Sequence, residues 1–444
     1  MATTVIIVRH GQSTFNAQQK IQGKSDLSVL TEKGISDARQ VGKTLENFNF
    51  DAFYCSPLTR AKQTAETIVE SLENAPELQT HQKLQEIDLP LWENLTKTEV
   101  KTRFAADYRQ WKEQPDRFKM VLDGGKEHFP VPTLYQQARE FWQEIISQNQ
   151  DKTILIVAHN GINRCLIMSA IGIPVERYHT IQQSNCCINV LNFTGDFGEP
   201  VQLESLNQTS HLGITLPSPR QDKYTRLLLV RHGETEWNRV SRFQGIKDIP
   251  LNENGKKQGN LAAEFLKEVS LDFAVSSTLL RPKETAELIL QYHPGVDLKT
   301  YPELVEISHG VWEGKLKDEV EAEFPGMIAQ WQAKPETVQM PEGENLQQVW
   351  DRAIAAWNQI AANHRDSDSE KTGIVVAHDA INKVILCYLL GLKPDNFWNI
   401  KQGNGAVSVI DYYHNPDSLA VLQAINITSH LSGSVIDKTA AGAL

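Results

Sequence analysis

The stretch VIIVRHGQSTFN at positions 5–16 decides the fold, and it returns as LLLVRHGETEWN at positions 227–238. In both places a run of apolar residues leads directly into Arg-His-Gly. A short, continuous apolar run is typical of a strand that is buried on both faces, as in a parallel sheet. The glycine allows the backbone to approach a ligand closely. Each copy therefore predicts a buried strand whose carboxyl end carries a histidine in a ligand-binding loop.

The repeat extends over both halves of the chain. CSPLTRAKQTAE (55–66) matches SSTLLRPKETAE (276–287), LQEIDLPLWEN (84–94) matches LVEISHGVWEG (304–314), and IVAHNGIN (156–163) matches VVAHDAIN (375–382). The spacing between matching residues drifts by only a few positions, as small deletions would produce. Self-similarity over such a length indicates a tandem duplication. We expect a first domain at 1–214, a polar, proline-containing linker at 215–224 and a second domain at 225–444.

Strand and helix patterns alternate within each half. Strands are expected at 5–8, 154–157, 227–230 and 374–376, and helices at 32–48, 58–72, 133–148, 253–269 and 345–364. This alternation predicts the α/β class, with two tandem three-layer α/β/α sandwich domains built on mostly parallel sheets. The carboxyl ends of the strands are where such folds bind ligands.

The composition narrows the classes of function. Hydrophobic residues make up 40% of the chain and charged residues 22%, and no apolar run is long enough to cross a bilayer. The net charge of −11 disfavours a nucleic-acid partner, because such binding needs a basic face. The first strand begins almost at the N-terminus, which leaves no room for a signal peptide. We therefore expect a cytoplasmic protein without a membrane or nucleic-acid partner; the sequence leaves its oligomeric state open.

Residues suited to phosphoryl transfer recur at matched positions in the two copies. The reaction needs an in-line nucleophile, positive charge around the phosphoryl oxygens and a proton donor for the leaving oxygen. A second histidine ends another strand, and an arginine lies near the start of a helix, where a guanidinium can bind phosphate through two nitrogens. The expected catalytic residues are His10, His159 and Glu86 in copy one and His232, His378 and Glu306 in copy two. The expected anion-binding arginines are Arg9, Arg60, Arg231 and Arg281.

Further polar residues should border the phosphate or the rest of the substrate. They are Asn16, Gln22 and Gly23 in copy one and Asn238, Gln244 and Gly245 in copy two. Other glutamates lie close to the expected acid/base groups, namely Glu93 in copy one and Glu303 and Glu313 in copy two, and the Glu-Ile position is favoured over them. Trp92 and Trp312 are expected to pack in the core. The chain has no His-x-x-x-His or similar pairing, so we expect neither a metal nor another cofactor.

These motifs resemble the histidine phosphatase superfamily, the phosphoglycerate mutase-like proteins, over almost the whole length of both halves. The resemblance implies that His10 or His232 attacks phosphorus and becomes phosphorylated. It also implies that the glutamate protonates the leaving alcohol and then activates water. Copy one resembles the sugar-acid phosphatases of this superfamily through RHGQSTFN, LQEIDL and QSNC, whereas copy two carries RHGETEWN, HGVWEG and PEGEN, as in its general phosphatases and mutases.

Three functions follow from this interpretation. The leading one is a metal-independent phosphatase acting on a small phosphorylated metabolite, either a sugar or a sugar acid. A phosphoglycerate mutase would use the same histidine, but copy one and copy two both lack a long insertion between the Glu-Ile motif and the second histidine, which favours the phosphatase. The third is one catalytic domain joined to a phosphate-binding regulatory domain. Neither copy has lost a charged member of the predicted site, which disfavours this third function.

Overall fold

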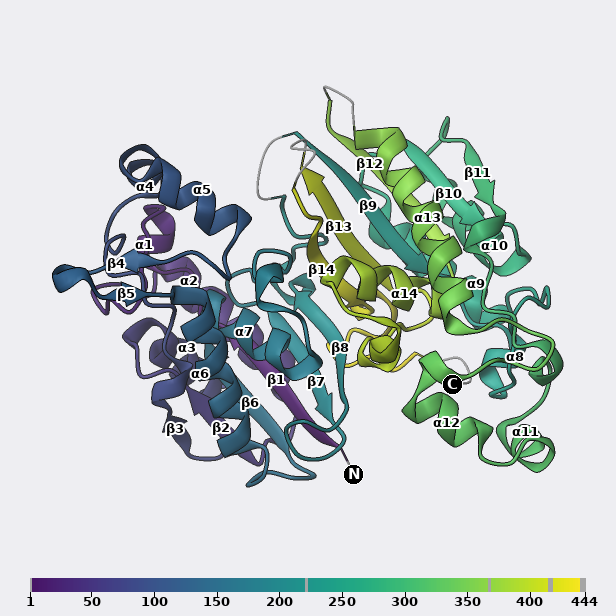
Figure 1. Cartoon of the computed structure of the whole chain (residues 1–444), viewed down its shortest axis with the longest axis horizontal. Coiled ribbons are helices and arrows are strands. Elements are labelled where there is room, and N and C mark those ends of the chain that lie inside the picture. The colour runs from purple at the N-terminus through teal and green to yellow at the C-terminus, as the bar shows by residue number, and fades with distance from the viewer. Residues whose placement is uncertain (1, 220–222, 366–368, 414–417, 440–444) are drawn as a thin grey trace. The chain divides into compact units, whose positions relative to one another are not determined.

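In the computed structural model, which describes residues 2–219, 223–365, 369–413 and 418–439, both Arg-His-Gly segments follow a central strand of a mixed sheet. The chain divides into two compact units, Met1–Ile214 and Thr215–Leu444 (Figure 1). The predicted linker at 215–224 falls at this division, and its residues 220–222 lie outside the described part of the chain. Each unit is described by itself.

The sheet of the first unit has the strand order β8-β7-β1-β6-β2-β3. β1 (Thr3–Arg9) runs parallel to β6 (Thr153–Ala158), and this register pairs Arg9 with Ala158. The two strands therefore end side by side, which places His10 next to His159. β6 is also parallel to β2 (Ala52–Cys55), and β2 to β3 (Leu78–Thr80). On the other side, β7 (Ile188–Phe193) and β8 (Val201–Gln208) complete the sheet as antiparallel strands.

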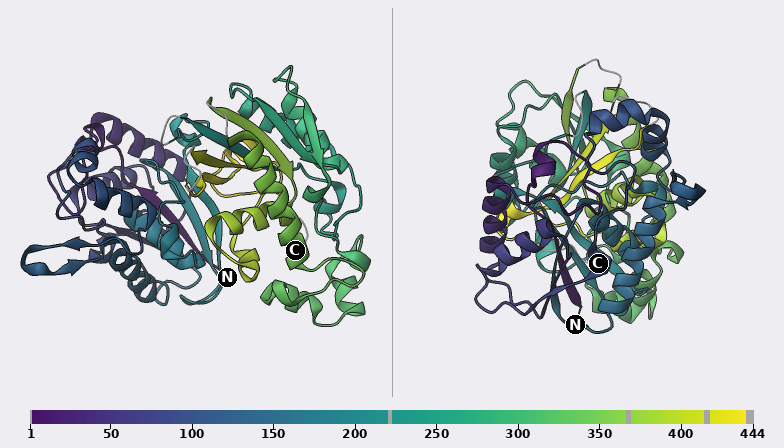
Figure 2. Two further views of the ribbon diagram at one scale, coloured as in Figure 1. Left: turned by 45° about the horizontal axis from the view of Figure 1, so that its top comes forward. Right: turned by 90° about the vertical axis from the view of Figure 1, so that its left-hand side faces the viewer.

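Helices cover both faces of this sheet. α2 (Glu32–Leu45) packs on α3 (Thr59–Val69), and α6 (Pro130–Ile145) packs on α7 (Asn160–Ile171). The sheet lies between the two pairs (Figure 2). Residues 5–8 are fully buried, which explains why this strand lacks the alternation of a half-exposed one. The predicted three-layer α/β/α sandwich is confirmed.

The second unit repeats this plan with the strand order β11-β10-β12-β9-β13-β14. β9 (Tyr224–Arg231) is parallel to β12 (Lys371–Ala377) and pairs Arg231 with Ala377, so His232 and His378 are again adjacent. The other strands are β10 (Phe273–Ser277), β11 (Leu298–Tyr301), β13 (Val407–Tyr413) and β14 (Val421–Ile427). The packed helix pairs are α9 (Glu253–Leu266) with α10 (Leu280–Leu290), and α13 (Leu346–Arg365) with α14 (Asp379–Leu390).

Most expected helices are displaced by only a few residues. The largest displacement is in α6, which begins at Pro130 rather than at 133 and ends at Ile145 rather than at 148. Its first turn contains two prolines, which are tolerated there because the first helical N–H groups need no partner within the helix. Proline in this segment therefore starts the helix instead of delaying it.

Each unit also has a segment of shorter helices between its glutamate motif and the next long helix, which is α6 in the first unit and α13 in the second. In the first unit this segment contains α4 (Lys97–Arg103), α5 (Ala105–Glu113) and the hairpin of β4 (Met120–Val121) and β5 (Glu127–His128). In the second unit it contains α11 (Lys317–Glu323) and α12 (Met327–Ala333). Trp331 of α12 reaches the pocket at the carboxyl edge of its sheet, so this segment helps to shape that pocket.

Candidate active site

Two histidines lie face to edge at the carboxyl edge of each sheet. The ring centroids of His10 and His159 are 5.1 Å apart with an interplanar angle of 61°, and those of His232 and His378 are 5.2 Å apart at 66°. All four side chains are almost completely buried. The structure therefore brings together the two histidines that the sequence had predicted to share a pocket, and it does so in both units.

The hydrogen bonds of His10 determine which of its nitrogens can act as a nucleophile. Its Nδ1 lies 2.7 Å from the carbonyl oxygen of Gly11, and His232 makes the same contact with Gly233 at 2.7 Å. A carbonyl can only accept, so Nδ1 carries the proton and Nε2 keeps its lone pair. Burial, followed by the charges of Arg60 and Arg9, lowers the pKa of His10 well below its usual range. The imidazole is therefore neutral near pH 7, with Nε2 free to attack phosphorus.

In the second histidine of each pair the hydrogen-bonded ring nitrogen is Nε2 instead of Nδ1. His159 Nε2 lies 2.8 Å from Ser56 Oγ, and this hydroxyl oxygen also accepts the N–H of Leu58 at 3.3 Å. The Ser56 hydroxyl can donate its proton to His159 Nε2, and in that tautomer the ring proton lies on Nδ1. That Nδ1 is buried and has no hydrogen-bond partner. His378 and Ser277 repeat the arrangement at 2.9 Å. These two serines were not predicted from the sequence.

The helix-start arginines are fixed by backbone carbonyls. Arg60 donates from Nη1 to Ser25 O and from Nη2 to Gly23 O, both at 2.9 Å. Arg281 contacts Lys247 O at 2.9 Å and Gly245 O at 2.7 Å in the same way. Burial lowers the pKa of each to about 10, so both stay charged at neutral pH. Gly23 and Gly245 therefore hold the arginines through their carbonyls.

Close packing explains the glycines at these two positions. Gly23 has a φ of +52° and Gly245 a φ of +54°, a region that residues with a Cβ rarely adopt. A Cβ on either would lie 2.2 Å from a carboxylate oxygen, that of Glu93 or of Glu313 respectively. These two glutamates accept backbone N–H groups of the same loops, such as Lys24 N and Ile246 N. They therefore support the arginine-holding loops.

The strand-end arginines complete the positive charge. Arg9 donates from Nη1 to Gln183 O at 2.7 Å, and Arg231 to Gln402 O at 2.6 Å. Among the predicted site residues of the first unit, Arg9 Nε, Arg60 Nε and His159 Nδ1 are buried and have no hydrogen-bond partner. In the second unit the same is true of Arg231 Nε and His378 Nδ1, while Arg281 Nε donates to His232 Nε2 at 3.2 Å.

The glutamates of the two Glu-Ile motifs lie at helix N-termini. Glu86 accepts the N–H of Gly161 at 2.9 Å and that of Ile162 at 3.1 Å, at the start of α7. Glu306 accepts the N–H of Ala380 at 3.2 Å, at the start of α14. Both are 8% exposed, whereas Glu303 is exposed. Burial, and after it the negative charge of Asp379, raises the pKa of Glu306, which favours its protonated form.

Amides organise the loop after the nucleophile. Asn185 Nδ2 donates to His10 O at 2.9 Å and to Asn16 Oδ1 at 3.1 Å, while Ser13 Oγ contacts Gln22 Oε1 at 3.0 Å. The second unit has the corresponding bonds: Asn404 Nδ2 contacts His232 O at 3.2 Å and Asn238 Oδ1 at 3.4 Å, and Thr235 contacts Gln244. Asn238, Gln244 and Gly245 line the pocket of that unit.

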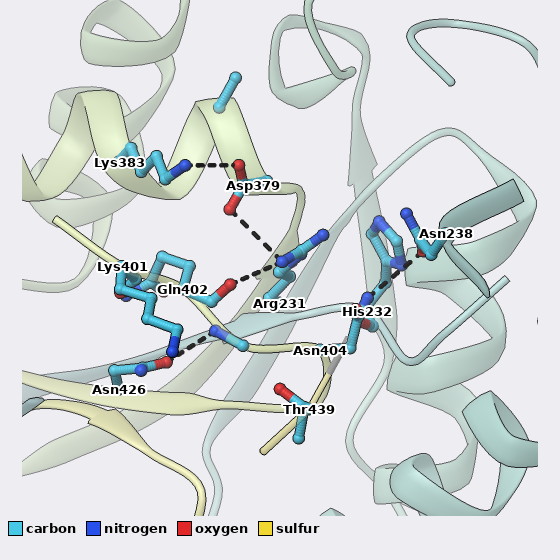
Figure 3. Close-up of polar contacts among 12 residues, drawn as sticks. Arg231, His232, Asn238, Asp379, Lys383, Lys401, Gln402, Asn404, Asn426 and Thr439 are labelled. Carbon is cyan, nitrogen blue, oxygen red and sulfur yellow. Dashed lines mark hydrogen bonds and ion pairs between the residues drawn. The ribbon is translucent and has the colours of Figure 1, made fainter. Parts of the chain in front are cut away.

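Several residues that line the pocket of the second unit were not among the predicted site residues. Asp379 forms ion pairs with Arg231, 3.4 Å away, and with Lys383, 2.7 Å away (Figure 3). The pocket is also lined by Arg242, His309, Trp331 and Phe397. Glu344 of the PEGEN segment lies outside that lining and instead binds Arg352 Nε at 2.8 Å. Arg352 in turn holds the Glu306 segment through the Val305 and Glu306 carbonyls, so PEGEN acts on the site through Arg352.

The described ranges contain neither a membrane-spanning helix nor a cluster of metal ligands. In residues 2–219, 223–365, 369–413 and 418–439 no helix is both long and apolar enough to cross a membrane. Within the same ranges no cluster of three or more His, Cys, Asp or Glu side chains could hold a metal ion. The predicted packing tryptophans, Trp92 and Trp312, are 1% and 0% exposed.

Both halves of the chain are similar to known proteins. The sequence matches the Histidine phosphatase superfamily (branch 1) over residues 5–206 and 227–425. A 2-carboxy-D-arabinitol-1-phosphatase from Triticum aestivum is 31% identical over 445 residues, covering 97% of this chain and 87% of that protein. Phosphoserine phosphatase 1 from Hydrogenobacter thermophilus is 36% identical over 208 residues, covering 46% of this chain and 94% of that protein. A phosphoserine phosphatase structure from Entamoeba histolytica with 3-phosphoglyceric acid is 28% identical, with a TM-score of 0.41, covering 47% and 99% of the two chains.

Proposed function

This chain belongs to the histidine phosphatase superfamily and is a phosphoric monoester hydrolase, and we propose that each of its two units hydrolyses esters through a phosphohistidine. The observation that carries this proposal is the set of unpaired, buried donors around His10: Arg9 Nε, Arg60 Nε and His159 Nδ1. A buried donor without a partner costs about 1–3 kcal/mol, more when charged. A bound phosphoryl group would supply acceptor oxygens to all three.

The reaction then follows from the positions of the protons. Nε2 of His10 attacks phosphorus, a P–N bond forms, and the ester P–O bond breaks. Glu86 gives its proton to the leaving oxygen, which departs as an alcohol. In the second step Glu86 accepts a proton from water, the water oxygen attacks phosphorus, and the P–N bond breaks to release phosphate and the neutral histidine. His232 and Glu306 would perform the same steps in the second unit.

We propose that the substrates are small phosphorylated sugars or sugar acids. The tandem relative from wheat, which aligns with nearly the whole chain, is named for 2-carboxy-D-arabinitol 1-phosphate. That ester is therefore the first substrate to test for the first unit. Both units retain two arginines, two histidines and a glutamate in matching geometry, which argues against a purely regulatory second unit.

Rapid-quench labelling tests the covalent step. The chain is mixed with a small alkyl ester labelled with ³²P and quenched in base, and the labelled peptide is identified. We expect acid-labile, base-stable label on His10 and His232, and none in the double variant His10→Ala/His232→Ala. The variants Ser56→Ala and Ser277→Ala are matched controls, because a serine hydrogen-bonded to a histidine is the main rival nucleophile. Label on either serine, or turnover without any label, would refute the mechanism.

Two further measurements separate the alternatives. Hydrolysis in H₂¹⁸O should place one heavy oxygen in the released phosphate, whereas a mutase would return the phosphoryl group to a second hydroxyl of the substrate. Activity should also persist in EDTA, because the positive charge of the site comes from arginine side chains. Loss of turnover in EDTA, with recovery on adding a divalent cation, would contradict metal independence.

A further inference from the structure

The residue after the second histidine differs in charge between the two units. It is Asn160 in the first unit and Asp379 in the second. Each is the first residue of a helix, and the backbone N–H groups at the start of that helix bind the proposed proton-donor glutamate. Asp379 Oδ1 lies 3.4 Å from Arg231 Nη1. Asn160 Nδ2 instead contacts Gln183 O at 3.4 Å, the same carbonyl that binds Arg9. This position therefore lies next to the strand-end arginine in both units.

The cation one helical turn later also differs in its surroundings. In the second unit Lys383 Nζ lies 2.7 Å from Asp379 Oδ2, so this cation is neutralised (Figure 3). In the first unit the corresponding residue is Arg164, whose guanidinium stacks 5.2 Å from the Tyr178 ring centroid. Arg164 is only 7% exposed and its Nε has no hydrogen-bond partner. The first unit therefore has a buried cation here without an aspartate at the helix start.

Other charges do not cancel this difference. Asp88 is a carboxylate that the first unit has where the second has Ser308, but it is 39% exposed and lies 3.8 Å from Lys24 Nζ. In the second pocket Arg242 lies 3.4 Å from Glu319, so it adds little unpaired positive charge. The site around Arg9 is accordingly more positive than the site around Arg231.

We propose that Asn160 and Asp379 select the charge on the part of the substrate beyond the phosphate. The first unit would accept esters with a carboxylate close to the phosphate, because the Arg164 charge has no aspartate beside it and an uncharged amide stands in the place of Asp379. The second unit would favour esters whose remainder is an uncharged alcohol or polyol, since Asp379 repels a carboxylate and accepts hydroxyl groups. This inference rests on the proposed function and adds the substrate class of each site.

A matched pair of esters tests the proposal. 3-Phosphoglycerate and glycerol 3-phosphate differ in whether a carboxylate or a hydroxymethyl group ends the carbon chain. His232→Ala leaves the first site to be measured alone, and His10→Ala leaves the second. The readout is kcat/KM for 3-phosphoglycerate divided by kcat/KM for glycerol 3-phosphate, because simple structural damage lowers both terms together. We expect this ratio to be at least about tenfold higher for the first site, since like charges in contact oppose binding.

Exchange of the two residues should move the ratio in opposite directions. Asp379→Asn in the His10→Ala chain should raise it about tenfold, and Asn160→Asp in the His232→Ala chain should lower it by a similar factor. Arg164→Lys, which keeps the charge, is the control for Arg164→Gln, which should lower the ratio. Added salt should reduce the difference between the sites.

The possible outcomes are distinguishable. Equal ratios for the two unexchanged sites would overturn the inference without requiring that any exchanged variant fold. Exchanges that lower kcat/KM for both esters by the same factor would overturn the inference as well, because residues 160 and 379 would then affect only the structure of the site. Failure of both single-site chains to hydrolyse either ester would overturn the proposed function itself, and the inference with it.

Discussion

One backbone contact fixes the tautomer of each imidazole that we propose as the nucleophile. The carbonyl of Gly11 holds the proton of His10 on Nδ1, and the carbonyl of Gly233 does the same for His232. Burial beside two arginines keeps both rings neutral. In the proposed mechanism the same arginines bind the phosphoryl group, so one set of charges would both keep the nucleophile unprotonated and attract the substrate.

Replacing the glutamates should distinguish proton donation from structural support. Glu86→Gln in the His232→Ala chain, and Glu306→Gln in the His10→Ala chain, should lower kcat for glycerol 3-phosphate roughly 10²–10⁴-fold, because an alkoxide needs a proton to leave. p-Nitrophenyl phosphate needs no such proton and should lose much less. Glu93→Gln is the matched control in the first unit. An equal loss on both esters would assign Glu86 a structural function instead.

The pH dependence of the second site should respond to Asp379. Burial raises the pKa of Glu306 first, and the Asp379 carboxylate raises it further. Glu306 must be protonated to donate, so activity on an alkyl ester falls as the pH rises through this pKa. Removing the Asp379 charge lowers the pKa, and the alkaline limb of kcat should therefore move to lower pH in Asp379→Asn. pH profiles of the His10→Ala chain with and without this change measure the shift. A shift to higher pH would contradict the assignment.

At the scale of elements, the N-terminus of one helix in each unit binds the glutamate that we propose as the acid and carries the residue that we propose selects the substrate charge. In the first unit Gly161 brings its N–H within 2.9 Å of Glu86, whereas Ala380 in the second lies 3.2 Å from Glu306. A Cβ on Gly161 would lie 2.5 Å from Glu86 Oε1 and 2.7 Å from the Tyr178 hydroxyl. The second unit accommodates its alanine in part because Phe397, which lacks a hydroxyl, replaces the tyrosine.

This comparison predicts the effect of adding one methyl group. Gly161→Ala in the His232→Ala chain should displace Glu86 and reduce kcat for glycerol 3-phosphate roughly 10–100-fold, part of the range for losing an acid/base group. Adding Tyr178→Phe, which copies the second unit, should recover much of the loss. Ala380→Gly in the His10→Ala chain is the reverse control and should change kcat little. Activity unchanged by Gly161→Ala would show that the carboxylate can relax without cost.

At the scale of the whole molecule, local patterns sufficed for the fold and for the positions of the histidines and arginines. Strand ends follow from apolar runs, and the repeat identified which polar residues recur beside them. Contacts between side chains at the ends of different strands could not be predicted from such patterns. Nothing near Ser56 in the sequence indicates that it meets His159, more than a hundred residues away. In the sequence Asp379 is one of many differences between the copies, and only its contacts with Arg231 and Lys383 place it at the site.

The duplication leads to a prediction about the rates of the whole chain. If each unit holds a complete site, kcat/KM of the unmodified chain for any ester should equal the sum of the values for His10→Ala and His232→Ala, and the double variant should be inactive. We expect His10→Ala to lose 2-carboxy-D-arabinitol 1-phosphate hydrolysis while keeping activity on phosphate esters of uncharged alcohols. His232→Ala should keep 2-carboxy-D-arabinitol 1-phosphate hydrolysis while its activity on phosphate esters of uncharged alcohols falls.

Two results would show that the sites are not independent. If both single variants lost every substrate in the same proportion, a shared or coupled site would be required. If their rates added to less than the rate of the unmodified chain, one unit would assist the other. Additive rates with opposite preferences would instead mean that duplication, followed by a change of charge at one helix start, gave one chain two phosphatase specificities from the same chemistry.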